Sequence, residues 1–272
     1  MLEETFTWQG DQQVRWSRHG SGPPVVFCHG TPWSSALWRP VADALAAQFT
    51  VYLWDMVGYG ASTMREGQDV SLAAQGRLLA DLLRHWQLDD PQLVAHDYGG
   101  AVALRAHLLH GAKLRSLTLV DVVALAPWGS PFFRLVAENA SVFGRLPAAL
   151  HGALVRAYIS GAAHRPLPAD RLDPLAAPWL DERGQAAFYR QIAQADQRYT
   201  DEIEHRYADL DLPVQVVWGS EDTWIPVDRA HRLAEQIAGA ELHLVPEAGH
   251  LIPVDAPEQL TALLQRWLLT HR

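Results

Sequence analysis

The chain has 272 residues, of which 49% are hydrophobic and 19% are charged, a balance that is typical of globular proteins. Its formal net charge of −9 disfavours nucleic acid and anionic membranes as partners. The acidic N-terminal residues lack an apolar stretch, and no apolar run reaches the length of a membrane span. Because Cys28 is the only cysteine, no internal disulfide can form. We therefore expect a cytoplasmic protein without a membrane partner.

The expected elements alternate between strands and helices up to residue 120. Apolar runs predict strands, and helical spacing of apolar residues predicts helices between them. The strands lie at residues 5–8, 14–18, 24–28, 50–54, 92–95 and 114–120, and the helices at residues 37–48, 71–86 and 98–110.

The alternation stops between about residue 127 and residue 209, a stretch rich in Ala, Pro, Arg and aromatic residues. Helical spacing is found there only around residues 132–138, 148–159 and 184–197. Beyond it, strands at 213–218 and 241–245 alternate with helices at 227–237 and 257–269. Repeated strand–helix units form parallel sheets with helices on both faces. The sequence therefore predicts an α/β fold with a mostly parallel eight-stranded sheet, a core of residues 1–126 and 210–272, and a helical cap of residues 127–209 after the sixth strand.

Residues 93–100, Leu-Val-Ala-His-Asp-Tyr-Gly-Gly, form the most informative motif. A short apolar strand, a turn of the pattern small-x-Asp-x-Gly and a following helix are typical of a nucleophile elbow, with Asp97 in the place that Ser usually takes. A carboxylate that attacks an ester would form a labile anhydride, whereas one that attacks an alkyl carbon forms an ordinary ester. The motif therefore favours substrates with a leaving group on saturated carbon, or epoxides. An ordinary turn with a solvated Asp at a helix N-terminus is the alternative interpretation.

Further polar residues follow other strands of the predicted sheet. Asp222 follows the strand at 213–218, His250 follows the strand at 241–245, and the segment His-Gly-Thr-Pro at 29–32 follows the strand at 24–28. In open α/β sheets, chemistry gathers at the carboxyl ends of the strands. The chain order of nucleophile, acid and histidine is typical of hydrolase folds. Asp121, directly after the strand at 114–120, is an alternative acid.

With these motifs the chain resembles the α/β-hydrolase superfamily over essentially its whole length. Within it, the chain is similar to the aspartate-nucleophile branch of haloalkane dehalogenases, haloacetate dehalogenases and epoxide hydrolases. Residues 29–39 resemble the oxyanion-loop region of haloalkane dehalogenases, and residues 55–62 look more like those of epoxide hydrolases.

The resemblance implies a reaction in two steps. Asp97 attacks carbon and forms an alkyl-enzyme ester; His250, oriented by Asp222, then activates a water molecule that hydrolyses the ester. The backbone N–H groups of Thr31 and Tyr98 are expected to bind the oxyanion of the second step. Some haloalkane dehalogenases carry their acid at the position of Asp121, so Asp121 stays open as the alternative.

The groups that bind the leaving group differ from the family pattern. Haloalkane dehalogenases usually have Trp directly after the nucleophile and a second donor after the His-Gly pair, and here those positions hold Tyr98 and Thr31. Epoxide hydrolases instead use two cap tyrosines. The candidates for lining the substrate or leaving-group pocket are Trp33, Trp128, Tyr158, Tyr189 and Trp224.

We expect a dehalogenase that acts on a small apolar halide, with an epoxide hydrolase as the alternative. A non-catalytic ligand-binding protein of the same fold is a third interpretation, from another class. The sequence has no metal-ligand cluster, phosphate loop or dinucleotide motif, so neither a metal nor a cofactor is expected. A monomer and a homodimer fit the sequence equally well.

Overall fold

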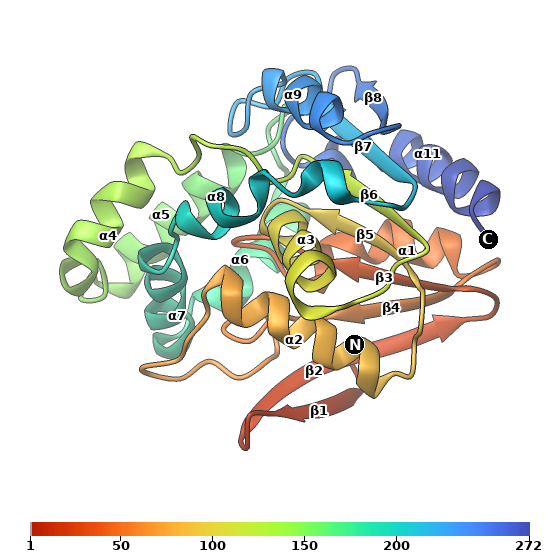
Figure 1. Cartoon of the computed structure of the whole chain (residues 1–272). Helices are drawn as coiled ribbons and strands as arrows, with labels where there is room; N and C mark the ends of the chain where they lie inside the picture. Colours follow the sequence, from red (N-terminus) through yellow and green to blue (C-terminus); the bar gives the residue numbers. More distant parts are fainter. Residues whose placement is uncertain (1) are drawn as a thin grey trace.

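The computed structural model describes residues 2–272, which form one eight-stranded sheet with helices on both faces (Figure 1). The strands follow the order β1-β2-β4-β3-β5-β6-β7-β8 across the sheet. β2 pairs antiparallel with both of its neighbours, β1 and β4, whereas all the other neighbouring strands pair parallel. The bounds are β1 Glu4–Trp8, β2 Gln12–Gly20, β3 Pro24–Cys28, β4 Thr50–Trp54, β5 Gln92–His96, β6 Ser116–Val120, β7 Val214–Gly219 and β8 Glu241–Val245.

The central strands are apolar throughout because both faces of the sheet are covered. Side chains alternate between the two faces of a strand. In β3, Val25 and Phe27 pack into the core on one face, while Val26 and Cys28 pack into the core on the other. A strand that is buried on both sides has no position at which a polar residue would meet water, which explains its continuous apolar sequence.

The helices divide between these two cores. Residues of α2, α3 and α9 pack into one core, and residues of α1, α10 and α11 into the other. Among residues 2–272, no helix combines the length and the apolar character that crossing a membrane requires. The bounds are α1 Arg39–Leu45, α2 Leu72–His85, α3 Tyr98–His110, α4 Pro131–Phe143, α5 Ala148–Ser160, α6 Ala169–Ala176, α7 Glu182–Ala193, α8 Arg198–Glu204, α9 Asp228–Gln236, α10 Ile252–Asp255 and α11 Pro257–Thr270, with short 3₁₀ helices η1 Ser35–Trp38, η2 Ala177–Trp179 and η3 Tyr207–Asp209.

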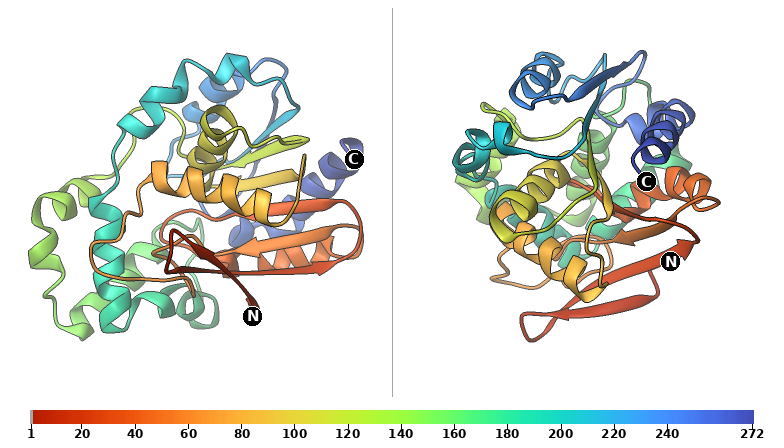
Figure 2. Two further views of the ribbon diagram at one scale, coloured as in Figure 1. Left: turned by 60° about the horizontal axis from the view of Figure 1, so that its bottom comes forward. Right: turned by 45° about the vertical axis from the view of Figure 1, so that its right-hand side comes forward.

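Helices α4 to α8 lie between β6 and β7 in the chain, where the sequence predicts the insertion. Figure 2 shows them gathered at one end of the sheet. Trp179 of η2 donates through its indole N–H to the carbonyl of Pro32, 2.8 Å away, so the insertion contacts the loop that follows β3. The predicted α/β-hydrolase architecture is confirmed, including a helical insertion after the sixth strand.

Several expected elements differ in detail. The predicted helix at 37–48 is a 3₁₀ turn followed by α1, and Pro40 lies in the first turn of α1, where a missing N–H costs nothing. The predicted helix at 184–197 is two helices, α7 and α8. Helix α6 was not predicted because Pro174 lies inside it, and α10 was not predicted because it has only 4 residues.

Phe27 provides a test of the core that positions β3. Its side chain is fully buried beside Trp38, with ring centroids 5.1 Å apart. We expect Phe27→Ala to lower the free energy of unfolding by about 3–5 kcal/mol, because removal of a buried aromatic ring leaves a cavity. Leu135 on α4 is 50% exposed, and Leu135→Ala should change this free energy by no more than about 0.5 kcal/mol. Urea denaturation of both variants measures the difference, and equal losses would contradict the assignment of the core.

Candidate active site

Asp97 lies at the turn between β5 and α3, in a backbone conformation that few side chains adopt. Its φ of 53° and ψ of −124° lie outside the regions that L-residues favour. Such strain persists only where the surroundings fix it, and it is frequent at functional sites. The side chain is 5% exposed. The sequence-predicted elbow is therefore present, with Asp97 at its tip.

Two glycines leave the room that this turn needs. A Cβ atom on Gly30 would lie 2.3 Å from Asp97 Oδ1, so any side chain there would displace the carboxylate. A Cβ atom on Gly99 would lie 2.5 Å from the carbonyl oxygen of Cys28 and 2.7 Å from that of His29. Gly99 therefore permits the close packing of the elbow against the end of β3.

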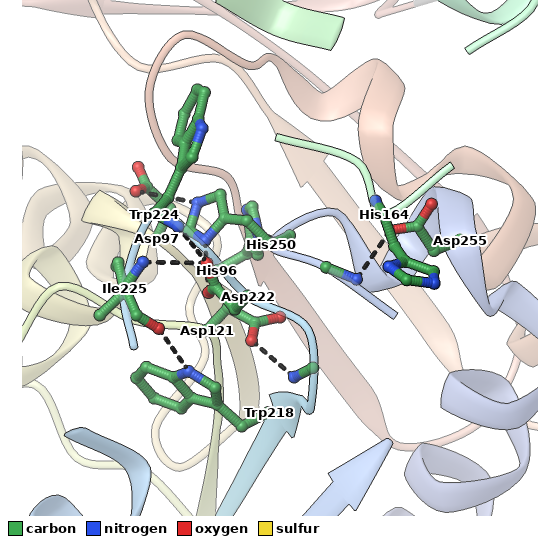
Figure 3. A network of polar contacts seen from close by, with 12 residues as sticks. His96, Asp97, Asp121, His164, Trp218, Asp222, Trp224, Ile225, His250 and Asp255 are labelled. Atoms are coloured by element: carbon green, nitrogen blue, oxygen red, sulfur yellow. Dashed lines mark hydrogen bonds and ion pairs between the residues drawn. The ribbon is translucent and has the colours of Figure 1, made fainter. Parts of the chain in front are cut away.

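The structure brings Asp97, His250 and Asp222 together at the carboxyl ends of β5, β8 and β7 (Figure 3). His250 Nδ1 lies 2.9 Å from Asp222 Oδ2, and His250 Nε2 lies 3.3 Å from Asp97 Oδ2. The imidazole of His250 has no exposed surface. It is thus held between two carboxylates, as the order of these residues in the sequence predicts.

The backbone of the loop after β3 completes the surroundings of Asp97. The N–H of Thr31 donates to Asp97 Oδ1 at 2.6 Å, a short distance that is typical of hydrogen bonds to a charged acceptor. Tyr98 is the first residue of α3, so its N–H is one of the amides that a helix leaves unpaired at its N-terminus. One carboxylate oxygen of Asp97 therefore faces a backbone amide, and the other faces the imidazole.

The two candidate acids occupy different places. Asp222 contacts His250, and its other oxygen accepts from the backbone N–H groups of Trp224 at 2.8 Å and Ile225 at 2.9 Å. Asp121 instead accepts from the backbone N–H of Gly219 at 2.8 Å. The carboxylate that touches the imidazole is thus Asp222, and Asp121 lies behind it.

His250 has a pKa well above its ordinary value. Burial by itself lowers the pKa, but the negative charges and hydrogen bonds of Asp222 and Asp97 outweigh burial and raise it. The two carboxylates therefore favour the protonated form of this imidazole. Because Asp97 contributes to this effect, loss of its charge would lower the pKa of His250 again.

Three residues that sequence reasoning did not assign to the site, His96, Asp255 and Gln191, form hydrogen bonds that hold it in place. His96 Nε2–H donates to the carbonyl of His250 at 2.8 Å, and burial lowers the pKa of His96 to about 4, so this ring stays neutral. Asp255 accepts from the N–H of Gly249 at 2.9 Å and of His164 at 2.8 Å (Figure 3). Gln191 of α7 accepts from the hydroxyl of Thr31 at 2.5 Å and that of Tyr59 at 3.3 Å. The sequence could have pointed to His96, which directly precedes Asp97, but no motif in the sequence points to Asp255 or Gln191.

A cavity of about 260 Å³ opens beside Asp97. Its walls come from the ends of the core strands and from the insertion, and they are mainly apolar and aromatic. Such a cavity suits a small apolar ligand. The residues that line it are Thr31, Asp97, Tyr98, Val123, Pro127, Trp128, Gly129, Ser130, Pro131, Phe133, Tyr158, Thr223, Trp224, Ile225 and Pro226.

Three of the five predicted pocket residues line this cavity, namely Trp128, Tyr158 and Trp224. The prediction was wrong for the other two. Trp33 stacks on Trp224, with ring centroids 6.0 Å apart and an interplanar angle of 22°, behind the cavity wall. Tyr189 packs inside the insertion, where its hydroxyl lies 2.9 Å from His151 Nδ1.

Polar groups that face the cavity are few. The indole N–H of Trp128 donates to Thr200 Oγ1 at 2.7 Å, so it is not free for a ligand. The hydroxyl of Tyr98 is buried and has no protein partner. Burial first, and then nearby groups including Asp97, raise the pKa of Tyr98 and of Tyr158 well above the usual value. Both phenols therefore keep their protons and can donate hydrogen bonds in the cavity.

Comparison with known proteins gives the family. Residues 23–257 match the model of the alpha/beta hydrolase fold. A crystal structure of an alpha/beta hydrolase fold protein from Burkholderia ambifaria is 48% identical, with a TM-score of 0.95 over 98% of both chains. This chain belongs to the α/β-hydrolase fold family and is a hydrolase by that membership.

Curated relatives have diverse activities. Haloalkane dehalogenase 2 of Mycobacterium tuberculosis is 25% identical over 93% of this chain and 90% of its own length. The 2-hydroxy-6-oxo-2,4-heptadienoate hydrolase of Pseudomonas putida is 27% identical over 92% of this chain and 90% of its own. These similarities support a hydrolase, but they do not identify its substrate.

The contact between Asp222 and His250 makes a prediction that needs no substrate. We expect Asp222→Asn to lower the pKa of His250, because the largest charge that favours the imidazolium is removed while the shape of the side chain is kept. Asp228→Asn removes the same charge at an exposed position on α9 and should leave this pKa in place. Titration of the His250 ring by NMR measures both. An unchanged pKa in Asp222→Asn would show that another group orients the histidine.

Proposed function

We propose that the chain is a hydrolase with Asp97 as its nucleophile, and that it cleaves carbon–halogen bonds in small apolar substrates. The observation that carries the proposal is a carboxylate at the elbow, with one oxygen 2.6 Å from the N–H of Thr31 and the other 3.3 Å from His250 Nε2. In this proposal, residues 127–209 act as the cap that closes the substrate cavity.

The first step forms a bond between Asp97 and carbon. Asp97 Oδ2 attacks the carbon that bears the halogen, the carbon–halogen bond breaks, and the halide leaves with the electron pair. Asp97 Oδ1 stays against the amide of Thr31 and becomes the carbonyl oxygen of the ester. The apolar walls of the cavity hold the substrate and exclude other water molecules.

The second step uses the change of charge that the first step creates. Esterification removes the negative charge of Asp97, which lowers the pKa of His250, so that the imidazole loses its proton to solvent and becomes a base. His250 then takes a proton from water, and the oxygen of that water attacks Asp97 Cγ. The amides of Thr31 and Tyr98 stabilise the oxyanion that forms on Oδ1. As the intermediate collapses, the departing alkoxide oxygen takes a proton from the imidazolium and leaves as the alcohol. The new carboxylic acid of Asp97 then gives its proton to His250, which restores the carboxylate and the imidazolium.

The hydroxyl groups in the cavity favour a halide as leaving group. A halide needs hydrogen bonds but no proton transfer, and Tyr98 has a free hydroxyl whose raised pKa suits donation without transfer. The similarity to a haloalkane dehalogenase is consistent with this choice. The N–H groups of Trp128 and Trp179 are bonded to protein acceptors, so neither of these two residues replaces the donor that the family usually has after the nucleophile.

An epoxide hydrolase is the second candidate, and one observation favours it. Tyr98 and Tyr158 both line the cavity beside Asp97, one from the core and one from α5 of the insertion. Two phenols on one side of a nucleophile could hold an epoxide oxygen and supply the proton that ring opening requires. The same nucleophile and histidine would serve this reaction.

A trapped intermediate tests the nucleophile. We expect His250→Gln to form the ester but not hydrolyse it, so incubation with 1-chlorobutane, 1,2-dibromoethane, chloroacetate or styrene oxide should add the mass of the alkyl group to the peptide that contains Asp97. Mass spectrometry detects the adduct, and circular dichroism confirms the fold of the variant. The added mass also identifies which of the two substrate classes reacts.

The control for the trap is the double variant Asp97→Asn with His250→Gln, which should stay unmodified. If the single variant also stays unmodified with all of these substrates, and wild-type protein neither releases halide nor opens styrene oxide, a non-catalytic binding protein is the better interpretation. If wild-type protein opens styrene oxide and releases no halide, the epoxide hydrolase replaces the dehalogenase.

Tyr98 tests the leaving-group site. We expect Tyr98→Phe to slow halide release about 100-fold, the loss typical of one donor that stabilises a developing charge. Tyr199→Phe, on α8 and outside the cavity wall, removes a hydroxyl that accepts from Arg198 and serves as the matched control. Halide release measured under single-turnover conditions isolates the first step. Equal rates in Tyr98→Phe and wild type would show that donors other than the Tyr98 hydroxyl bind the halide.

A further inference from the structure

Two buried carboxyl groups lie side by side behind the catalytic histidine. Asp121 directly follows β6, Asp222 follows β7, and the two strands pair with Val120 opposite Val217. The side chain of Asp121 lies within hydrogen-bonding reach of that of Asp222, and Figure 3 shows the two close together, with Asp222 as the one that contacts His250. Two negative charges at this separation without water strongly disfavour each other. One of the two carboxyl groups therefore carries a proton.

The hydrogen bonds decide which one it is. Asp222 accepts from three N–H groups: those of Trp224 and Ile225 on Oδ1, and that of His250 on Oδ2. Asp121 accepts from one, the N–H of Gly219 on Oδ1. Its Oδ2 is buried and meets no N–H or O–H donor. Because N–H bonds stabilise the ionised form of a carboxyl, the charge belongs on Asp222 and the proton on Asp121 Oδ2.

The charges around the pair agree with this placement. Burial raises the pKa of Asp121 well above its ordinary value, and the charge of Asp222 raises it further. The opposing influence of His250 and of the N–H of Gly219 is smaller. His96, which feels the charge of Asp222, has a pKa lowered to about 4 by burial and is neutral.

We propose that Asp121 is a neutral positioning residue, whose carboxyl O–H donates to Asp222 and holds that carboxylate against His250. Asp222 then has four donors, which fix its rotamer and keep it ionised. The negative charge around His250 is limited to Asp97 and Asp222. When Asp97 becomes an ester, only one carboxylate remains beside the imidazole, and His250 can release its proton and act as a base.

This role in turnover rests on the proposed function, whereas the protonation state of Asp121 does not. A third negative charge would hold the imidazolium in place after esterification and oppose the second step. The backbone of Asp121 has a φ of 45°, a region that Asn tolerates well among residues with a side chain. Asp121→Asn is therefore a variant that keeps the backbone, the shape and a donor toward Asp222.

The test measures protonation without substrate. In wild-type protein at neutral pH, we expect an infrared band of a buried protonated carboxyl group that is absent in Asp121→Asn. NMR titration of His250 should give the same pKa in wild type and in Asp121→Asn, because a neutral donor replaces a neutral donor. Asp121→Ala removes the O–H that donates to Asp222. The negative charge of Asp222 is then less dispersed and attracts the imidazolium more strongly, so the pKa of His250 should rise.

Each outcome decides the proposal. If Asp121 were ionised, the infrared band would be missing, and Asp121→Asn would lower the pKa of His250 by removing a negative charge. If Asp121→Ala leaves the pKa of His250 unchanged, Asp121 does not position Asp222. With an active substrate, hydrolysis of the alkyl ester should slow in Asp121→Ala and recover in Asp121→Asn. A protein that shows the band and the titrations but no turnover would refute the proposed function and leave this inference intact.

Discussion

The site depends on one arrangement, in which the imidazole of His250 is held between the carboxylates of Asp222 and Asp97. A buried imidazolium is unfavourable by itself, and these two partners make it stable. The three residues come from different strand ends, so only the parallel register of β5 to β8 can bring them together. In the proposed reaction, loss of one carboxylate charge on esterification changes the histidine from an acid into a base.

The backbone around Asp97 is held in a strained form that the surrounding packing stabilises. Its positive φ is fixed by β5 on one side and α3 on the other, and glycines at 30 and 99 remove the side chains that would collide there. The strain turns the carboxylate toward the amide of Thr31 and away from the strand. Stability of the core is thus used to hold a reactive group in a geometry that it would not adopt alone.

The insertion is tied to the same site through side chains. Gln191 of α7 accepts from the hydroxyl of Thr31, and Trp179 of η2 donates to the carbonyl of Pro32. The loop that supplies the amide beside Asp97 is therefore bonded to α7 and η2 of the insertion. Changes in the insertion can alter both the shape of the cavity and the position of that amide.

The sequence by itself determined the alternation of strands and helices, the place of the insertion and the elbow at Asp97, because hydrophobic periodicity and turn residues act locally. It favoured Asp222 as the acid and left Asp121 as the alternative, since both follow neighbouring strands; the path of the backbone after β7 is what brings Asp222 to the imidazole. It could not separate Trp128 and Trp224, which line the cavity, from Trp33 and Tyr189, which do not. All four are aromatic, and the direction that each one faces is decided by packing between segments far apart in the chain.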